Sequence, residues 1–425
     1  MPHAVLATIG SLGDLHPFIA IGRALRSQGH RVTLAIPEDG VAKARAAGLD
    51  AVAILPSYAS ICARLGLSEA ETAARVLADT NFVLDEILIP TLQTSTAALD
   101  AVCADADVLA GSIFAFAADI VAEKRRLPLA SVILQPMTLF SAWQPPVAPH
   151  FELLRHHPRS NLGRSWNRMA YALARTALRR RYAPRIDAVR GEHGLGPSRG
   201  APMLDHGPAT AATLCCWSAA LSTLPPDAPD NAVLTGFPFF DSESGAEEAP
   251  TPELDAFLRE GDRPLVFTLG SFAVAAAGRF YAEAAAASRT LGMRAVMLTG
   301  EAGPARREGD CLFAGYAPHS LLFPHAAAVV HHGGIGTTGQ ALRAGRPQIV
   351  VPHFGDQFDN AARLQAAGIG MTVKRGAFEA SHAARALSQA LASSAMQQAA
   401  RDAAARIAHE EGAAEAARSI LSLCR

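Results

Sequence analysis

The sequence carries almost no net charge. Its 38 Lys and Arg residues oppose 39 Asp and Glu residues, which gives a formal charge of −1 over 425 residues. Proteins that bind nucleic acid neutralise its phosphates with an excess of basic side chains. The composition therefore predicts no nucleic-acid partner.

Cysteine is also scarce. None of the six cysteines belongs to a Cys-x-x-Cys pair, and Cys215 and Cys216 are adjacent, which does not suit a metal site. The sequence thus predicts reduced thiols in a cytosolic protein.

Long hydrophobic runs are missing as well. The most apolar stretch, residues 108–122, contains Asp119 and is shorter than the roughly 20 residues that span a bilayer. No basic segment precedes the first apolar run, so no signal peptide is expected. We predict a cytoplasmic protein and leave open a peripheral contact with the inner membrane.

What the sequence does contain is a repeated strand and helix pattern. Residues 3–11 form an apolar run that ends in Gly-Ser, which is typical of a strand buried on both faces. A helical pattern over 17–28 and a strand over 31–36 follow, and together they indicate a βαβ unit.

The second half of the chain begins in the same way. Residues 263–271 end in Gly-Ser, and a helix over 280–291 and a strand over 294–299 follow. Residues 224–252 are rich in Pro, Asp, Glu and Ser, which indicates a linker. We therefore predict an α/β protein with two doubly wound domains.

The most informative segment is residues 326–345. An apolar strand ends at His331-His332, a glycine turn follows, and a helix is predicted to begin near Thr337. Glycines let backbone N–H groups approach a phosphate, and a helix N-terminus favours negative charge there. This segment therefore predicts a phosphate site.

Residues 334–339 also match the Gly-x-Gly-x-x-Gly fingerprint of dinucleotide-binding proteins, with Asp356 about 20 residues beyond. A nicotinamide-dependent oxidoreductase is therefore an alternative. The fingerprint normally follows the first strand of its domain, whereas this one lies deep in the second half. Asp356 also falls in a loop beyond the next strand, so the pattern disfavours that alternative.

The motif His332-Gly-Gly-x-Gly-Thr, with Gly345-x-Pro347, Pro352, Asp356-Gln357 and Asn360, resembles the donor-binding signature of family 1 glycosyltransferases with the GT-B fold. Residues 10–18 resemble the bacterial and fungal branch, which includes sterol and antibiotic glycosyltransferases. Residues 127–131, 235–241 and 263–271 resemble most closely the rhamnosyltransferases of rhamnolipid synthesis.

This resemblance covers nearly the whole sequence and implies two Rossmann-like, doubly wound domains that face each other across a cleft. Residues 1–235 would bind the acceptor and residues 236–405 the nucleotide sugar. The last helix, predicted over 396–423, would bring residues 406–425 back toward the N-terminal domain.

The resemblance also assigns donor-binding roles. Tyr316 would stack on the base, and Asp356 and Gln357 would hold the sugar. Gln340 stands where many relatives carry a ribose-binding Glu, which is compatible with a deoxyribose. The predicted nucleotide-binding residues are Tyr316, Ala317, Ser271, His332, Gly334, Thr337, Thr338 and Gln340.

Asp14 is the candidate general base, because something must accept the proton of the attacking acceptor hydroxyl. It stands where the plant branch has a catalytic His, and the position of that dyad's Asp falls near Gly111 or Ser112. Two alternatives remain open: Asp14 only caps the following helix, or His16 is the base.

No metal or other cofactor is expected beside the nucleotide sugar. Asp105-Ala-Asp107 matches a metal-binding pattern of other transferases, but it lies far along the chain from the donor signature, and we interpret it as a solvated turn. The glycine turn, the helix dipole and His332 would stabilise the leaving diphosphate instead.

Acceptor residues are harder to identify. Trp143, Phe116 and Phe82 are candidates, with core packing as the alternative for each. Residues 155–190 contain ten arginines, two histidines and one acid. They form either a solvated helical face or a wall that contacts anionic lipid.

Taken together, these patterns predict an inverting glycosyltransferase that moves L-rhamnose from a thymidine diphosphate donor to the hydroxyl of a lipid-like acceptor. The alternatives are a glucosyltransferase that uses uridine diphosphate glucose and a sterol or polyketide acceptor, the oxidoreductase, and a nucleotide-sugar sensor without activity.

Overall fold

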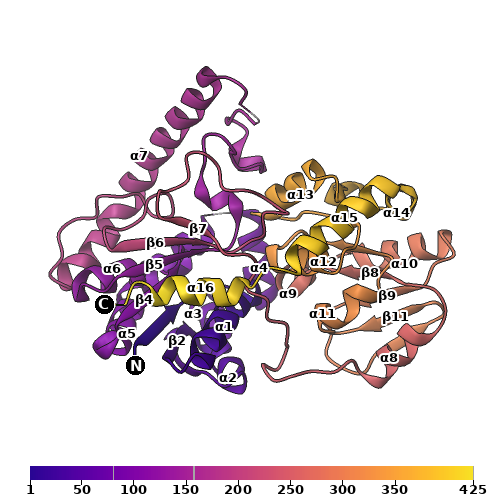
Figure 1. Cartoon of the computed structure of the whole chain (residues 1–425), viewed down its shortest axis with the longest axis horizontal. Coiled ribbons are helices and arrows are strands. Elements are labelled where there is room, and N and C mark those ends of the chain that lie inside the picture. Colours follow the sequence, from indigo (N-terminus) through magenta and orange to yellow (C-terminus); the bar gives the residue numbers. More distant parts are fainter. Residues whose placement is uncertain (80, 157, 425) are drawn as a thin grey trace. The chain divides into compact units, whose positions relative to one another are not determined.

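The computed structural model describes residues 1–79, 81–156 and 158–424, in two compact units (Figure 1). Unit 1 comprises residues 1–219, 223–240 and 411 onward, and unit 2 comprises residues 220–222 and 241–410. Arg425 of the predicted C-terminal segment and His157 of the arginine-rich segment lie outside the described residues.

Unit 1 is built on a seven-stranded parallel sheet with the order β3-β2-β1-β4-β5-β6-β7. The first strand pairs with β2 on one side, where His3 lies opposite Arg31, and with β4 on the other, where Ala4 lies opposite Val108. The carboxyl ends of β1 and β4 therefore form a topological switch point, where α/β proteins bind ligands. The strands are β1 (His3–Ala7), β2 (Arg31–Pro37), β3 (Asp50–Leu55), β4 (Val108–Ser112), β5 (Leu129–Ile133), β6 (Thr210–Cys215) and β7 (Ala232–Leu234).

The first helix of unit 1 starts earlier than the sequence predicts. It begins at Leu12 instead of Pro17, because Ser11 caps it and Asp14 completes a capping box. The helices are α1 (Leu12–Ser27), α2 (Glu38–Ala46), α3 (Tyr58–Leu65), α4 (Glu69–Ala78), α5 (Ile89–Val102), α6 (Phe116–Arg125), α7 (Asn161–Glu192) and α16 (Gly412–Leu421).

One helical stretch of unit 1, residues 83–105, is long and apolar enough to cross a membrane by length and composition. Half of its apolar window is buried inside the structure, and Leu84, Leu88, Leu92 and Leu99 belong to a hydrophobic cluster of unit 1. A buried core helix passes the same test, so this stretch is weak evidence for a membrane span.

Unit 2 contains a second seven-stranded sheet, ordered β10-β11-β9-β8-β12-β13-β14. All pairs are parallel except the β10–β11 hairpin at one edge. Its switch point lies between β8 and β12, where His331 lies opposite Thr268. The strands are β8 (Leu265–Thr268), β9 (Ala295–Leu298), β10 (Arg306–Glu308), β11 (Cys311–Ala314), β12 (Ala328–His331), β13 (Gln348–Val350) and β14 (Gly370–Thr372).

Successive residues of β8 enter different cores: Leu265 and Phe267 join one hydrophobic cluster and Val266 another. Both faces of the sheet are therefore covered, as the apolar run predicts. The helices are α8 (Pro252–Arg259), α9 (Gly270–Ala273), α10 (Phe280–Thr290), α11 (His319–Leu322), α12 (Ile335–Arg343), α13 (Gln357–Ala366), α14 (Ala380–Ala392) and α15 (Ser394–Ile407). The predicted fold class, two doubly wound α/β domains, is confirmed.

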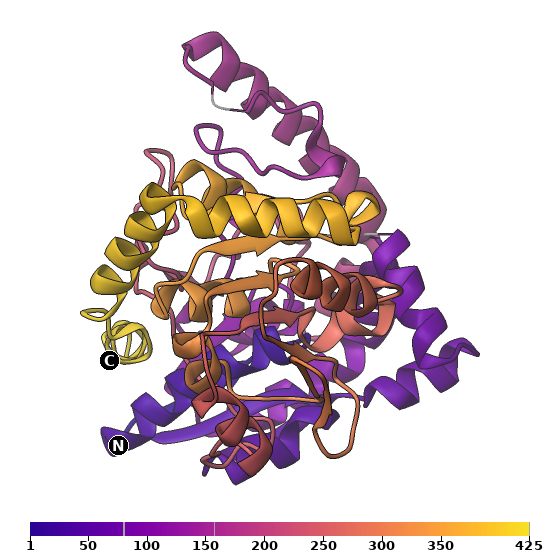
Figure 2. The same cartoon turned by 90° about the vertical axis from the view of Figure 1, so that its right-hand side faces the viewer.

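The prediction of one helix over residues 396–423 is wrong. The chain forms α15, which contacts α12 in unit 2, and α16, which contacts α1 in unit 1. A side chain at Gly412 would clash with the Phe237 carbonyl, so the glycine lets α16 begin close to the backbone there. Figure 2 shows α16 bringing the end of the chain to the side of unit 1 that holds the N-terminus.

The unit boundaries fall at 240/241 and 410/411, five residues beyond the predicted 235/236 and 405/406. Residues 236–240 stay with unit 1 because their aromatic side chains pack there. The ring of Phe240 lies 5.3 Å from that of His16 and 5.8 Å from the Arg23 guanidinium.

Candidate active site

The switch point of unit 2 holds His332 against two glycines. A side chain at Gly270, after β8, would place its Cβ 2.5 Å from His332 Cε1, and one at Gly334 would clash with His332 Nε2. Gly270 also has a φ of +68°, which disfavours other residues. The imidazole therefore lies directly against the backbone of both turns.

The preceding residue, His331, is a buried structural residue. Its Nδ1 accepts a hydrogen bond from the Gly333 N–H at 3.1 Å, so its Nε2–H donates to Gln348 Oε1 at 2.8 Å. Burial lowers the pKa of His331 to about 4. The neutral ring joins β12 to β13 and fixes the start of the glycine turn.

His332 differs because no described residue forms a hydrogen bond with its ring, and Nδ1 is buried. Burial holds the pKa of His332 well below its usual value, and the nearby His331, His353 and His319 lower it further. A neutral imidazole keeps one N–H donor. Buried polar atoms without partners are rare in folded proteins, so this ring is suited to a bound ligand.

The helix that follows the turn, α12, has no side-chain cap. Its first N–H groups lie beside Gly334 and the exposed Gly336, where an anion can bind them. Thr337 is buried at this end. Thr338 and Gln340 are buried, and Thr338 Oγ1 and Gln340 Oε1 have no partner among the described residues. Ser271 is exposed in α9, directly after Gly270.

The loop after β13 is tied to the same turn. The buried Asn360 side chain donates to the Gly333 carbonyl at 2.9 Å and to Asp356 Oδ2 at 2.8 Å. Gln357 Oε1 accepts from the His353 N–H at 2.8 Å and the Phe354 N–H at 3.2 Å. Asn360 thus positions Asp356 beside the His332 turn, a role that the sequence motif contains but does not reveal.

Tyr316 is held by a residue that sequence reasoning missed. Its hydroxyl donates to Asp241 Oδ1 at 3.0 Å, and the Ser320 N–H donates to Asp241 Oδ2 at 2.5 Å. Burial and the Asp241 charge raise the pKa of Tyr316. Ala317 is buried in the same loop. The only sequence signal for Asp241 is its place at the end of the Phe-Phe-Asp run.

We expect Asp241→Ala to weaken nucleotide binding by about tenfold, because two hydrogen bonds to one carboxylate order the Tyr316 loop. Isothermal titration with the nucleoside diphosphate measures this. Glu247→Ala is the matched control, since Glu247 is an exposed carboxylate in the same segment. Equal affinities for the Asp241 variant and the wild type would show that the loop needs no such support.

In unit 1, Asp14 lies at the switch point after β1, in the first turn of α1. Its Oδ2 accepts from the Ser11 N–H at 3.0 Å and from the Ser11 hydroxyl at 3.5 Å, so the capping alternative is real. No described residue donates a hydrogen bond to Oδ1. Desolvation raises the pKa of Asp14 to about 6, although the Ser11 hydrogen bonds oppose the shift. One oxygen caps the helix, and the other is left for a proton.

The candidate acceptor residues are mostly enclosed. Phe116 belongs to a hydrophobic cluster of unit 1, and Phe82 is also buried. Trp143 is half-buried, and the Arg164 guanidinium lies 3.7 Å above its ring. The placement of Phe116 favours the core-packing alternative for that residue.

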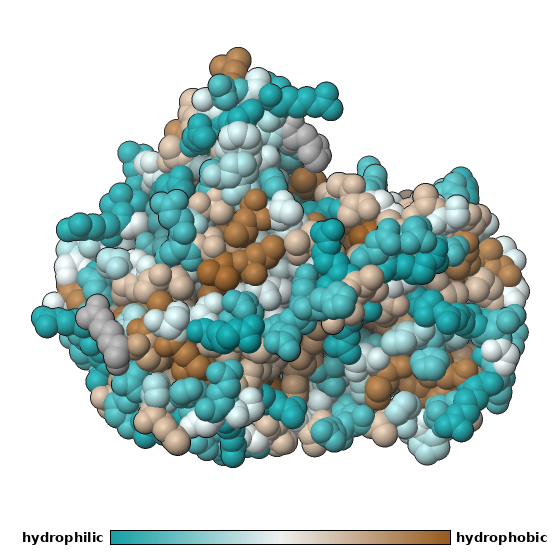
Figure 3. All heavy atoms as spheres, viewed as in Figure 1, coloured by the Kyte–Doolittle hydropathy of each residue, from teal (hydrophilic) through white to brown (hydrophobic). Residues whose placement is uncertain are grey.

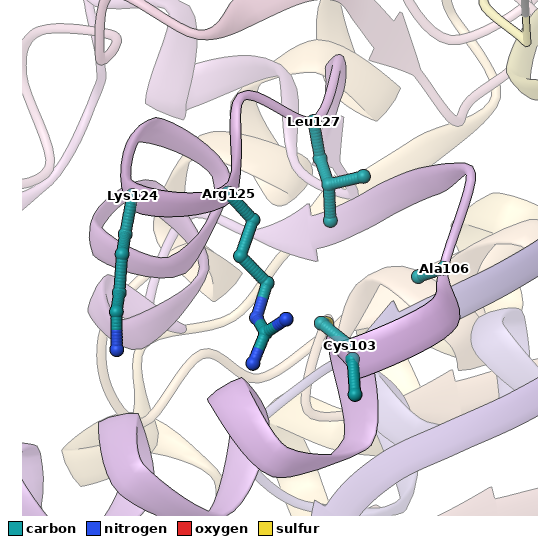
Figure 4. A pocket seen from close by; sticks show the side chains of 6 residues that line it. Cys103, Ala106, Lys124, Arg125 and Leu127 are labelled. Atoms are coloured by element: carbon teal, nitrogen blue, oxygen red, sulfur yellow. The ribbon is translucent and has the colours of Figure 1, made fainter.

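The Asp105-Ala-Asp107 motif lies at the opposite, amino edge of the same sheet. Asp105 binds Arg31 Nη2 at 2.5 Å, and Asp107 Oδ2 accepts from the His3 N–H at 2.7 Å. A pocket beside it is lined by residues that precede β4 and β5 (Figure 4). Ligand sites of such folds lie at the carboxyl ends of the strands, so neither feature belongs to the candidate site. The lining residues are Cys103, Ala104, Ala106, Lys124, Arg125 and Leu127.

Two doubly wound domains, each with polar residues at its switch point, define a two-domain α/β protein. Residues 308–423 match the family model described as erythromycin biosynthesis protein CIII-like, C-terminal domain. O-mycaminosyltylonolide 6-deoxyallosyltransferase of Streptomyces fradiae is 30% identical over 400 residues, which cover 85% of this chain and 83% of that protein. The chain therefore belongs to the family 1 glycosyltransferases with the GT-B fold.

Two further comparisons agree. The sterol 3-beta-glucosyltransferase of Aspergillus clavatus is 29% identical over 432 residues, which cover 97% of this chain but only 29% of that longer protein. The solved structure of the spinosyn rhamnosyltransferase SpnG has a TM-score of 0.66 at 21% identity and covers 99% of this chain and 100% of its own. Family membership leaves the oxidoreductase alternative without support.

Proposed function

We propose that this chain is an inverting glycosyltransferase that moves L-rhamnose from thymidine diphosphate rhamnose to the hydroxyl of a lipid-like acceptor. The observation that carries the proposal is the neutral His332, which has no hydrogen-bond partner among the described residues and lies between Gly270 and Gly334 beside the uncapped end of α12. These groups suit a diphosphate, the part that all nucleotide-sugar donors share.

In this proposal the N–H groups of α12 and His332 bind the diphosphate, with Ser271 and Thr337 beside them. They stabilise the charge that develops as the sugar leaves, so the reaction needs no metal. Asp356 and Gln357 hold the sugar hydroxyls, and the Tyr316 ring stacks on the base.

Asp14 Oδ1 takes the proton of the acceptor hydroxyl. The acceptor oxygen forms a bond to the anomeric carbon while the bond from that carbon to the diphosphate oxygen breaks, and the nucleoside diphosphate leaves. A single displacement of this kind inverts the anomeric centre. The free Oδ1 and the raised pKa of Asp14 support this role.

The choice of a thymidine diphosphate donor rests on Gln340 and on one similar solved structure. Gln340 is a buried neutral amide whose Oε1 has no partner among the described residues, which is compatible with a deoxyribose. A rhamnosyltransferase is among the similar structures. The second candidate is glucosyl transfer from uridine diphosphate glucose to a sterol, which the similarity to the fungal enzymes over 97% of the chain favours.

A thermal-shift series tests the donor. At 100 times its dissociation constant, a ligand stabilises a fold by about 2.7 kcal/mol, which such an assay detects readily. We expect a larger shift with thymidine diphosphate and its rhamnose adduct than with the uridine series. The reverse order would support glucosyl transfer. A shift with a nicotinamide dinucleotide and with neither diphosphate would contradict the proposal.

A further inference from the structure

Helix α7 and the segment before it have two different environments. Toward its C-terminal end, Tyr182, Ile186 and Val189 are buried in the core of unit 1. Its N-terminal half extends beyond the rest of that unit (Figure 1), and Figure 3 shows hydrophobic surface at this free end beside hydrophilic side chains. The free half therefore serves something other than the core.

The described residues contain seven exposed large hydrophobic side chains, and five of them fall within residues 153–173. Four of the five are spaced by four, three and four residues, which places them on one face of α7. Exposed apolar residues are normally scattered singly, so this concentration indicates an interaction surface. The five are Leu153 (78% exposed), Leu162 (82%), Trp166 (42%), Met169 (49%) and Leu173 (66%).

The opposite face of α7 is anchored. The buried Asn167 side chain donates to the Ala142 and Arg155 carbonyls, each at 3.1 Å, and the Tyr171 hydroxyl donates to the Ser141 carbonyl at 3.1 Å. These bonds fix the rotation of the helix about its axis. The apolar face thus cannot turn inward without breaking buried hydrogen bonds.

Arginines surround this apolar face. Residues 153–186 contain nine arginines and no Asp or Glu. Arg175 pairs with Asp205, and Arg181 and Arg185 pair with Asp85. The other six form no ion pair with a carboxylate in the described part of the chain: Arg155, Arg159, Arg164, Arg168, Arg179 and Arg180. A local excess of six positive charges contrasts with the near-neutral chain.

We propose that this surface, the five apolar residues with Arg155, Arg159, Arg168, Arg179 and Arg180, docks on an anionic lipid bilayer. Arg164 is not part of the surface, because its guanidinium stacks on Trp143 and its Nε is buried. The helix lies in the interfacial plane, its apolar side chains enter below the headgroups, and the arginines bind lipid phosphates. Trp166 suits this depth because Trp favours the membrane–water interface. A second copy of the chain is a poor occupant, because two such faces would oppose arginine to arginine.

Vesicle flotation with the purified full chain tests this without substrates, so the result is independent of the proposed function. Phosphatidylcholine vesicles that contain phosphatidylglycerol should carry the protein at least about tenfold better than phosphatidylcholine alone, and high salt should release it. Trp fluorescence should shift to shorter wavelength on binding, and the shift should disappear in Trp166→Ser.

Two sets of variants separate the contribution of the apolar residues to vesicle binding from that of the arginines. The triple variant Leu162→Ser, Met169→Ser, Leu173→Ser should lose at least about tenfold in vesicle binding, whereas Val52→Ser, another exposed apolar residue of unit 1, should bind like the wild type. Replacing Arg159, Arg168 and Arg179 by Ser should remove the preference for anionic lipid. The control with the same charge change replaces exposed arginines of unit 2, namely Arg259, Arg279 and Arg306.

Because all the substituted side chains are exposed, unfolding temperatures should stay close to that of the wild type. Three outcomes would overturn the proposal. They are no flotation of the wild type with the anionic vesicles, unchanged binding of the apolar triple variant, and a dimer in sedimentation velocity that depends on this face without vesicle binding.

Discussion

Replacing Asp14 by Asn should lower kcat by about 10²–10⁴-fold while leaving donor affinity within about twofold. Asn has the size of Asp and can still accept the Ser11 N–H that caps α1, but it cannot take a proton from the acceptor. Measuring turnover and titrating thymidine diphosphate on the same preparation separates the effect on kcat from the effect on donor affinity.

The chain supplies a matched control for the capping alternative. Ser68 and Glu71 form the same capping box at the start of α4, and Glu71→Gln changes only that cap. If Asp14 were only a cap, the two variants would keep similar turnover. A large loss confined to Asp14→Asn identifies the proton acceptor.

The pH dependence follows from the raised pKa of Asp14, about 6, which desolvation causes. Below pH 6 the carboxyl is protonated and cannot act as a base, so kcat/KM should fall on the acid side with an apparent pKa near 6, and Asp14→Asn should lack this limb. Folding stability depends on pH in the opposite direction to kcat/KM. A pKa raised above the unfolded value means that stability is lost as the pH rises from about 4 to 6, so Asp14→Asn should not be less stable at pH 8.

Gly334→Ala should weaken binding of the nucleoside diphosphate by about 10- to 100-fold, the range expected for losing a hydrogen bond to a charged group. The φ of Gly334 is −58°, which suits alanine, so the backbone is not strained. The new Cβ would instead clash with His332 Nε2 and move the imidazole.

His332→Ala tests the same interaction without a steric change. It should weaken binding to a similar degree, and the double variant should lose little more, because both changes remove one contact. Gly376→Ala is the matched control, since a Cβ there meets no atom within 4 Å. Unchanged affinity in His332→Ala would show that this ring does not bind the diphosphate, whatever the stability of the glycine variant.

Local sequence patterns determined the fold class of this protein and several of its strands and helices. The apolar runs that end in Gly-Ser, followed by helical spacing, predict β1, α1, β8 and α10, because buried parallel strands and amphipathic helices leave period and length in the sequence. The glycine turn after His332 also predicts a phosphate site, since only glycine permits that close approach. The fold class and the position of the candidate donor site along the chain could thus be predicted from the sequence alone.

The tertiary structure alone decided the contacts between distant residues. Asp241 meets Tyr316 across 75 positions of the chain, and Asn360 reaches Gly333 across 27. Gly412 lets α16 begin directly against the Phe237 carbonyl. Which face of the N-terminal half of α7 is exposed depends on the hydrogen bonds from Asn167 and Tyr171 to the carbonyls of Ala142, Arg155 and Ser141. Such pairings follow the path of the whole chain, whereas a sequence pattern reports only which residues share a strand or a helix face.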